Sequence, residues 1–332
     1  MTKRTRLFLL IAAGVLVLGL GTGLLASYMG VQTLTIVGSN GPDELAYLPQ
    51  DSRLVAFANV RDVMDSGMRR TLDALQPGRP QRNGDFQAAT GIDFETDVDS
   101  VVASLGSGEG ADSERMLVLA RGRFDEVRIE GLIRERGGDV EDYKGTRLLT
   151  VPGGNGADDN RPLAVAFVET GLVAFGPGTA VRRAIDTEAG DGADVTANRE
   201  LMGIIRDIDD GNAWAVGRFD AIAGTGRIPK DIAGQLPPIT WFAGSGHIND
   251  GLEGFLRAET SSDEAANDLR EVIRGFVALA RMQTRQNVEL GALLNSLQLG
   301  GEGKTVSLGF SVPPNAITAF AAMRRVSPGS TP

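Results

Sequence analysis

The sequence predicts an α+β protein whose largely antiparallel sheets pack on helices, preceded by one N-terminal transmembrane helix. Three observations predict this. A long uncharged run follows a cationic N-terminus, strand-length segments such as 252–259 alternate apolar and polar residues, and helix-length segments with the 3.6-residue period lie between them. With 332 residues, 42% hydrophobic and 23% charged, the chain has ordinary globular composition. Disordered and polytopic membrane proteins are therefore excluded.

The N-terminus predicts a signal anchor. The basic tip, residues 1–6, carries Lys3, Arg4 and Arg6, and residues 7–31 carry no charge. A membrane helix needs roughly 20 apolar residues, whereas the apolar part of a cleaved signal peptide has only about 7–15. We therefore expect residues 7–31 to span the bilayer uncleaved. Cleavage near Ala26-Ser27-Tyr28, a poor match to A-x-A, is the alternative.

The position of the cations predicts the orientation. By the positive-inside rule the N-terminus stays in the cytoplasm. The chain is then a single-pass protein of the bacterial inner (cytoplasmic) membrane, with its main body in the periplasm or outside the cell. Gly19 and Gly23 form a G-x-x-x-G pair through which two spans could self-associate. Another envelope protein is the alternative partner.

The exported body is acidic. The chain carries −10 and its first 30 residues contribute +3, which leaves −13. An acidic body repels phosphate backbones, so no nucleic-acid partner is expected. The chain has no cysteine and one histidine, His247, which excludes disulfides, thiolate sites and multi-histidine metal centres. We expect no metal and no cofactor.

The first half of the body begins after a polar spacer, residues 32–46. Its expected elements are a strand at 53–60, a helix at 61–75, a loop at 76–92, strands at 100–105 and 115–121, a helix at 124–136, strands at 146–151 and 163–175 (the latter a hairpin broken at 169–171), and a helix from Pro177 to about Asp186.

The second half repeats this order. Its expected elements are a strand at 212–218, short helices within 219–235, strands at 239–248 and 252–259, a long helix, a helix near 288–297, a strand at 304–312, and a last helix from Pro313-Pro314 to about Arg325. A capping box, Ser261-x-x-Glu264, is expected to start the long helix. The tail, residues 326–332, should be loose.

Both halves therefore read β-α-β-β-α-β-β-α, over residues 47–190 and 191–325. Local echoes support a duplication: Asp62 and Asp220 follow equivalent strands, and Pro177 and Pro314 open the last helices. The alternative is one α+β domain with generic alternation of strands and helices.

No catalytic motif is found, so no catalytic, cofactor-binding or metal-binding residue is assigned and the chain is expected not to be an enzyme. Ser245 and His247 lie two residues apart on one expected strand, which puts them on one face, but a third orienting group is missing. The Gly-rich segment 106–110 precedes a strand and not a helix, so a phosphate cradle is disfavoured. We interpret these features as a strand surface and a loop.

Acidic clusters occur at Asp158-Asp159 and at Asp207, Asp209 and Asp210. The second resembles the start of a calcium loop, but its fifth and twelfth positions are Gly211 and Arg218. A solvated helix end is the expectation and weak calcium binding the alternative. Trp214 and Trp241 are expected to be core or sheet-face aromatics.

Two segments resemble bacterial membrane-anchored envelope proteins of an uncharacterised family, defined only as a domain of unknown function. They are residues 47–63, with Leu48-Pro49-x-Asp51 before a strand, and residues 91–106, with Asp93 and Asp97 before another. The resemblance implies a membrane-tethered, extracytoplasmic α+β protein and no catalytic residues.

The leading hypothesis is therefore a non-enzymatic, membrane-tethered scaffold or binding protein of the bacterial envelope. A second is a carrier or sensor for a lipid or other apolar ligand, held in a groove between sheets and helices. The third is a hydrolase based on two convergent carboxylates.

Overall fold

The computed structural model describes residues 41–75, 91–107, 116–151, 162–223, 236–283 and 288–316. The predicted basic tip 1–6, the anchor 7–31, most of the spacer, the end of the last helix and the tail 326–332 lie outside these ranges. None of the described helices combines the length and apolarity of a membrane span. The described residues form two compact units. The N-terminal unit lies within Leu34–Asp62 and Pro80–Asp209, and the C-terminal unit within Val63–Arg79 and Asp210–Pro332.

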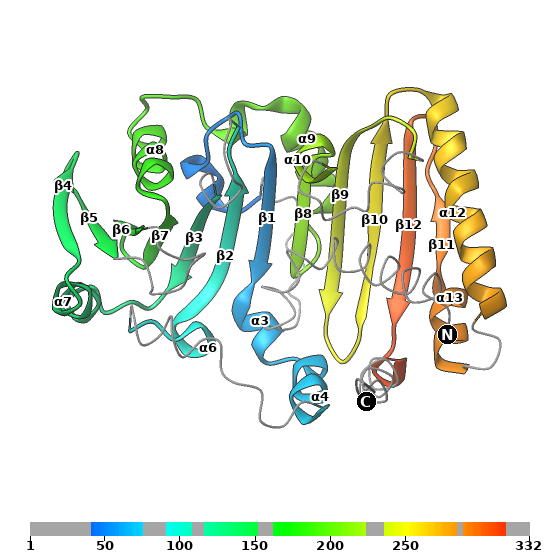
Figure 1. Cartoon of the computed structure of the whole chain (residues 1–332), viewed down its shortest axis with the longest axis horizontal. Coiled ribbons are helices and arrows are strands. Elements are labelled where there is room, and N and C mark those ends of the chain that lie inside the picture. The colour runs from blue at the N-terminus through cyan, green and yellow to red at the C-terminus, as the bar shows by residue number, and fades with distance from the viewer. Residues whose placement is uncertain are drawn as a thin grey trace, which may run out of the picture. The chain divides into compact units, whose positions relative to one another are not determined.

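The N-terminal unit contains an antiparallel sheet with the strand order β1-β2-β3-β7-β6-β5-β4 (Figure 1). Its strands are β1 (Leu54–Asn59), β2 (Val98–Leu105), β3 (Met116–Gly122), β4 (Asp139–Tyr143), β5 (Thr146–Val151), β6 (Leu163–Glu169) and β7 (Leu172–Gly176). The predicted antiparallel pairing is confirmed. β4 ends this order and was not foreseen, because its sequence, DVEDY, is mostly polar.

Helices cover this sheet through short apolar stripes. Helix α8 (Gly178–Glu188) buries Val181, Ala184 and Ile185 and packs on β6 and β7. Helix α7 (Glu126–Glu135) buries Ile129 and Ile133 and packs on β4 and β5. The other described helices of the unit are η1 (Asp43–Tyr47), α6 (Phe94–Asp97), η3 (Val195–Ala197) and α9 (Arg199–Ile208).

A buried ion pair fastens η1 to the sheet. The Glu44 carboxylate, with a 6% exposed side chain, accepts a hydrogen bond from Nε of Arg121 on β3. The other side of the Arg121 guanidinium lies 3.2 Å from Oε1 of Glu169. Burial alone would lower the pKa of Arg121, but its hydrogen bonds to Glu44 and Glu169 raise it overall. The Arg121 guanidinium therefore stays charged beside the buried carboxylate.

Tyr47 extends the same network. Its hydroxyl donates to Oε2 of Glu169 over 3.2 Å. Burial, followed by the nearby Glu169 carboxylate, raises the pKa of Tyr47 to about 12. The phenol thus stays neutral and keeps donating, so that a second side chain of η1 is held at the end of the sheet.

In the C-terminal unit the antiparallel strands follow the order β8-β9-β10-β12-β11 (Figure 1). Its strands are β8 (Ala213–Arg218), β9 (Ile239–Ile248), β10 (Leu252–Thr260), β11 (Gln298–Gly300) and β12 (Thr305–Val312). The expected alternation is confirmed: Leu256 lies opposite Leu308, and Ala258 opposite Val306. Its described helices are α4 (Gly67–Leu75), α10 (Asp220–Ala223), α12 (Asp263–Gln283) and α13 (Val288–Ser296).

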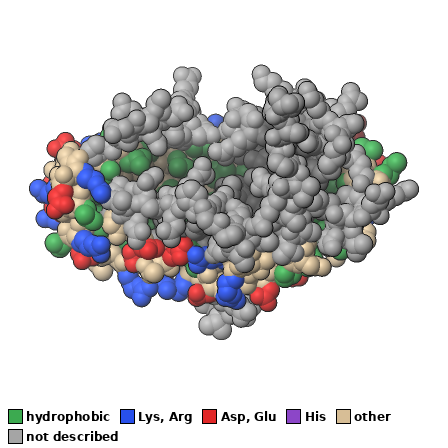
Figure 2. All heavy atoms as spheres, turned by 60° about the horizontal axis from the view of Figure 1, so that its bottom comes forward, with side chains coloured by type: hydrophobic (Ala, Val, Ile, Leu, Met, Phe, Trp, Pro, Cys, Tyr) green, Lys and Arg blue, Asp and Glu red, His purple; other side chains and the backbone are tan. Residues whose placement is uncertain are grey.

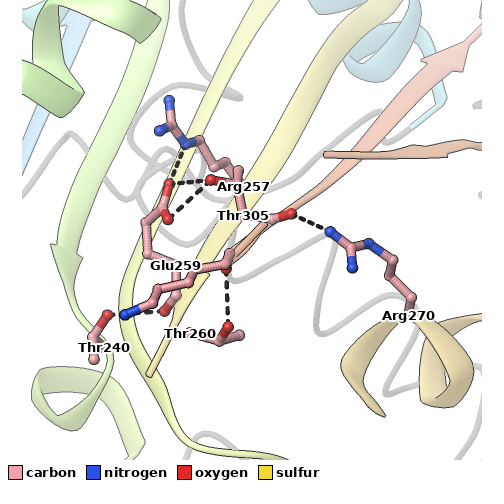
Figure 3. A network of polar contacts seen from close by, with 7 residues as sticks. Thr240, Arg257, Glu259, Thr260, Arg270 and Thr305 are labelled. Carbon is pink, nitrogen blue, oxygen red and sulfur yellow. Dashed lines mark hydrogen bonds and ion pairs between the residues drawn. The ribbon is translucent and has the colours of Figure 1, made fainter. Parts of the chain in front are cut away.

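The long helix α12 packs over β10 and β12 through its first turns. Ala266 and Leu269 form a buried cluster with Val306. The Nη2 of Arg270 donates to the carbonyl oxygen of Thr305 at the start of β12 over 2.7 Å (Figure 3). It also donates to the carbonyl oxygens of Gly301 (3.1 Å) and Gly303 (3.3 Å) in the turn before this strand. These bonds fix the first half of the helix to the sheet.

The capping residue of α12 differs from the prediction. The Ser262 hydroxyl, and not that of Ser261, accepts the N–H of Ala265 over 3.1 Å. The backbone N–H of Ser261 instead donates to the carbonyl of Pro238. The predicted capping box is therefore wrong by one residue, because the chain before Ser262 is still paired with another loop.

The single helix predicted for 61–75 is also wrong. The chain forms two short helices, α3 (Val60–Met64) and α4, because Ser66 starts a new helix: its hydroxyl accepts the N–H of Arg69 over 3.0 Å. The N–H of Met68 donates to the carbonyl of Asn249, so α4 belongs with the β9–β10 turn.

We expect Arg121→Ala to lower the free energy of unfolding by about 3–5 kcal/mol, because it leaves the Glu44 carboxylate buried without its cation. Urea denaturation checks this value. The control is Arg274→Ala, which breaks an ion pair with Glu271 in which both side chains are more than half exposed and should cost under about 1 kcal/mol. Equal losses in the two variants would contradict the role given to the buried pair.

Candidate functional site

An open cavity of about 910 Å³ lies in the N-terminal unit. Its lining comes from three parts of the chain that are distant in sequence: the segment before β1, the end of α8 with the following loop, and the start of α9. The lining residues are Pro49, Gln50, Asp51, Arg183, Asp186, Thr187, Asp191, Gly192, Ala193, Ala197, Asn198 and Arg199.

Backbone pairing fixes one wall of this cavity. Pro49 and Asp194 form an antiparallel bridge. The N–H of Val195 donates to the carbonyl of Leu48 over 2.7 Å, and the N–H of Gln50 donates to the carbonyl of Ala193 over 2.9 Å. The side chains of Leu48 and Val195 are fully buried. The loop is therefore held in place by apolar burial as well as by hydrogen bonds.

Side chains fix the opposite wall. The Asp51 carboxylate accepts hydrogen bonds from Nη2 of Arg183 on α8 and from the hydroxyl of Ser107. At the start of α9, the Asn198 side chain accepts the N–H of Leu201 over 3.2 Å, which is an ordinary N-cap. Arg199 follows directly and is exposed. Its side chain has no ion-pair or hydrogen-bond partner among the residues that the structure describes.

The β4–β5 hairpin is clamped to the edge of the cavity. Its two-residue turn, Lys144-Gly145, has φ angles of 53° and 83°, as a type I′ turn requires. The Lys144 ammonium binds the carboxylates of Asp186 and Asp191. The Tyr143 hydroxyl donates to both carboxylate oxygens of Asp186, over 3.0 and 3.1 Å. Two carboxylates of the cavity lining are thus already bound by side chains of the β4–β5 hairpin, which is not part of the lining.

The pKa shifts at this clamp favour the charged forms. The hydrogen bond from Lys144 is the main cause that lowers the pKa of Asp186. The same bond, followed by that to Asp191, raises the pKa of Lys144, and the hydrogen bond to Asp186 raises that of Tyr143. A carboxyl group that acts as a general acid needs a raised pKa. Asp186 is shifted in the opposite direction.

The hydroxyl groups near the cavity are also engaged. Ser52 donates to the carbonyl of Pro49 over 2.7 Å, and Thr187 donates to the carbonyl of Arg183 over 2.8 Å. Neither hydroxyl contacts a base that could activate it as a nucleophile. The Arg199 guanidinium and the exposed Gln50 amide remain available to a ligand. The arrangement is suited to binding a polar partner that carries a carboxylate or other anionic group.

Ser245 and His247 lie on β9, as predicted, but no hydrogen bond joins them among the described contacts. The buried Ser245 hydroxyl donates instead to Oδ1 of Asp210 over 3.1 Å. The interpretation of these two residues as a strand surface is wrong for Ser245, which is only 6% exposed because the segment before β8 covers it.

The acidic segment 207–212 makes the turn between α9 and β8. Asn212 is buried there, and its amide exchanges two hydrogen bonds, of 2.9 and 3.0 Å, with the backbone of Ile248. The described residues hold no group of three or more acidic or histidine side chains that could bind a metal ion. Asp158-Asp159 and most of the Gly-rich segment 106–110 lie outside the described residues.

The other residues singled out from sequence have structural positions. Trp214 and Trp241 are 2% and 5% exposed, which confirms that they are core aromatics. Asp93 caps α6 by accepting the N–H of Glu95 over 2.8 Å, and Asp97 accepts the N–H of Asp93. Of the motif Leu48-Pro49-x-Asp51, both Pro49 and Asp51 line the cavity.

No protein-family model and no curated protein matches this chain. One solved structure, crystal form I of TP0453, is similar to it with a TM-score of 0.44 and 8% sequence identity, over 85% of this chain and 98% of that chain. A likeness at this level assigns neither a family nor a function.

We expect Lys144→Met to destabilise the protein in a pH-dependent way. The pKa of Asp186 is lowered in the folded state, so its contribution to stability is present above the ordinary value of 3.8 and is lost as the pH falls through the folded-state pKa. The difference in free energy of unfolding between wild type and variant should therefore shrink in acid. Urea denaturation at a series of pH values measures it. Lys304→Met removes the same charge from the C-terminal unit and should show no such acid convergence; convergence in both variants would refute the clamp.

Proposed function

We propose that this chain is a membrane-tethered binding protein of a bacterial envelope, whose body faces the periplasm or the cell exterior. The uncharged run 7–31 behind Lys3, Arg4 and Arg6 supports the tether and its orientation. On this proposal the anchor keeps the body near the membrane, and the body binds a partner protein without chemical turnover.

The single observation that carries the binding role is the state of the charges around the cavity. Asp51, Asp186 and Asp191 each have a cation of this chain as partner, whereas Arg199 has none among the described residues. A partner with an exposed Asp, Glu or chain-terminal carboxylate would complete this pattern. The cavity is open and has charged and polar side chains in its lining, which suits a segment of another protein better than an enclosed apolar molecule.

We further infer that the two units descend from one duplicated element. In the N-terminal unit the spatial order is β1-β2-β3-β7-β6. The first three strands lie in the order in which they follow one another along the chain, whereas β6 and β7 lie in the reverse of their chain order. The order β8-β9-β10-β12-β11 of the C-terminal unit follows the same rule. A helix connects the third strand to the later ones in both cases, α7 in one and α12 in the other. β5 and β4 would then be an addition to the first copy.

A carrier for an apolar ligand is the second candidate function. One face of the C-terminal sheet presents Phe242, Leu256, Leu308 and Phe310, all only partly buried among the described residues. Such a surface could lie against an acyl chain. The cavity near Arg199 does not have this character, so the two candidate functions use different units and can be tested separately.

The binding role predicts a specific crosslink. With a benzophenone amino acid in place of Arg199, the full chain irradiated in its native membranes should yield one reproducible protein adduct. The matched control is the same substitution at Arg136, an exposed residue directly after the last residue of α7, which should not yield this adduct. Arg199→Ala should weaken the isolated complex by about tenfold or more, because a hydrogen bond to a charged group contributes about 1.5–3 kcal/mol. Recovery of the uncrosslinked chain alone from both positions would count against the proposal.

The carrier role predicts a co-purifying lipid. Organic extraction and mass spectrometry of the purified full chain should find an apolar molecule at stoichiometric amount, and Leu308→Asp should remove it. Ser307→Asp, on the opposite face of the same strand, should retain it. Circular dichroism establishes that both variants are folded. A protein that carries no such molecule, or that keeps it in both variants, would eliminate this candidate.

A further inference from the structure

The burial of side chains on α12 decreases from its first half to its second half. In the first half, the buried residues Ala265, Ala266 and Leu269 hold the helix to the sheet, and Arg270 ties it to the turn before β12 (Figure 3). From residue 272 to 282 no side chain is fully buried. The helix thus continues for three turns beyond its well-packed region.

Large apolar side chains are exposed in this second half. Leu279 and Met282 are 45% and 62% exposed, and Gly275 and Ala278 beside them are exposed too. A helix surface that contacts only water normally carries polar residues at such positions, and an apolar outer face normally has something covering it. Helix propensity does not require these residues, because Glu, Lys, Gln and Arg form helices equally well.

The charges on the helix are also divided. The exposed acids, Asp263, Glu264, Asp268 and Glu271, all belong to the first half. Between residues 272 and 282 the only charged side chains are Arg274 and Arg281, which lie seven residues apart and therefore on the same side of the helix. The helix macrodipole favours this order of charges, but it gives no reason for exposing Leu279 and Met282.

We propose that the surface formed by Arg274, Ala278, Leu279, Arg281 and Met282 docks onto an anionic lipid bilayer. Leu279 and Met282 would enter the boundary between headgroups and acyl chains. Arg281 donates one hydrogen bond from Nη2 to the carbonyl of Leu294 on α13, over 3.1 Å. Its remaining N–H groups, and those of Arg274, would contact lipid phosphates. Residues 272–282 contain no acid, and the adjacent acid, Glu271, is paired with Arg274. This second membrane contact is independent of the cavity near Arg199.

The acidic character of the body does not prevent such docking. Charges further from the bilayer than about 8 Å are largely screened at physiological ionic strength. At the left and lower edge of the face shown in Figure 2, acidic and basic side chains of the described residues are intermixed. The Arg274 guanidinium lies 2.5 Å from Glu271, but both side chains are more than half exposed, so this pair is weak and can exchange for a lipid phosphate.

The absence of cysteine from the chain permits a direct test. Met282→Cys in the full chain accepts a single environment-sensitive fluorophore. The labelled protein is placed in vesicles of phosphatidylcholine with phosphatidylglycerol, in which a fraction of the lipids is brominated. Bromine should quench the fluorophore at position 282, and likewise one at Leu279→Cys. A fluorophore at Asn267→Cys, exposed on the first half of the same helix, is the matched control and should not be quenched.

The arginine contribution is tested in the Met282→Cys background. Arg274→Gln should lower the ratio of docked to undocked helix about fivefold, because one cation near an anionic surface contributes about that factor. Pure phosphatidylcholine vesicles should lower it further, because both arginines then lose the anionic surface. Circular dichroism checks that the helix is retained in each variant.

Two results would overturn the proposal. One is the absence of quenching at both 279 and 282 in anionic vesicles. The other is a disulfide crosslink between two unlabelled Met282→Cys chains together with absence of quenching, which would assign the surface to self-association. Either result leaves the Arg199 crosslink unaffected, so failure here is distinguishable from failure of the proposed binding function.

Discussion

The bridge between Pro49 and Asp194 is the contact on which the candidate site depends. It joins the chain that enters the N-terminal unit to the loop between α8 and α9, and it is backed by the buried side chains of Leu48 and Val195. Just before it, η1 is held by the Glu44–Arg121 pair. Because bridge and ion pair lie within six residues, the entering chain has little freedom, and the cavity wall it forms is preorganised for binding.

Charge pairing then decides what the cavity offers. The clamp at Lys144 holds Asp186 and Asp191 from one side, and Arg183 holds Asp51 from another. Burying or pairing charges rarely adds much stability at a surface. Its effect here is on specificity, since paired carboxylates leave Arg199 as the main unsatisfied charge of the lining. On the proposed binding role, the site would favour anionic groups although three of its lining residues are acidic.

The strands could be predicted from the sequence more completely than the candidate site. β10 follows from the alternation of apolar and polar residues over 252–259, which is typical of a strand and not of a helix. β4 could not be foreseen, because an edge strand need bury little, and only Val140 and Tyr143 in it are apolar. Helix α9 did leave a signal: Asn198 is a good N-cap, and Leu201, Ile204, Ile205 and Ile208 follow the helical period. The one-residue error at Ser262 reflects a loop contact with Pro238 that no local pattern encodes.

The candidate site itself was only partly predictable, for a topological reason. Its lining combines residues near 50 with others between 183 and 199, and the clamp adds Lys144. Sequence reasoning marked Pro49 and Asp51 through a motif, but the partner Arg183 is more than a hundred residues away. Periodicity and capping describe neighbours along the chain. They contain no information on which distant loops meet.

The open edge at β4 has a consequence for crowding at a membrane. A terminal strand exposes unpaired backbone groups that another chain could extend into a fibril. On β4 these groups are flanked by Asp139, Glu141 and Asp142. Two such edges brought together would place like charges directly opposite one another, which is unfavourable in an antiparallel pair. On the proposed membrane tether, copies of the chain would meet far more often than in free solution, and this acidic border would oppose pairing of their edges.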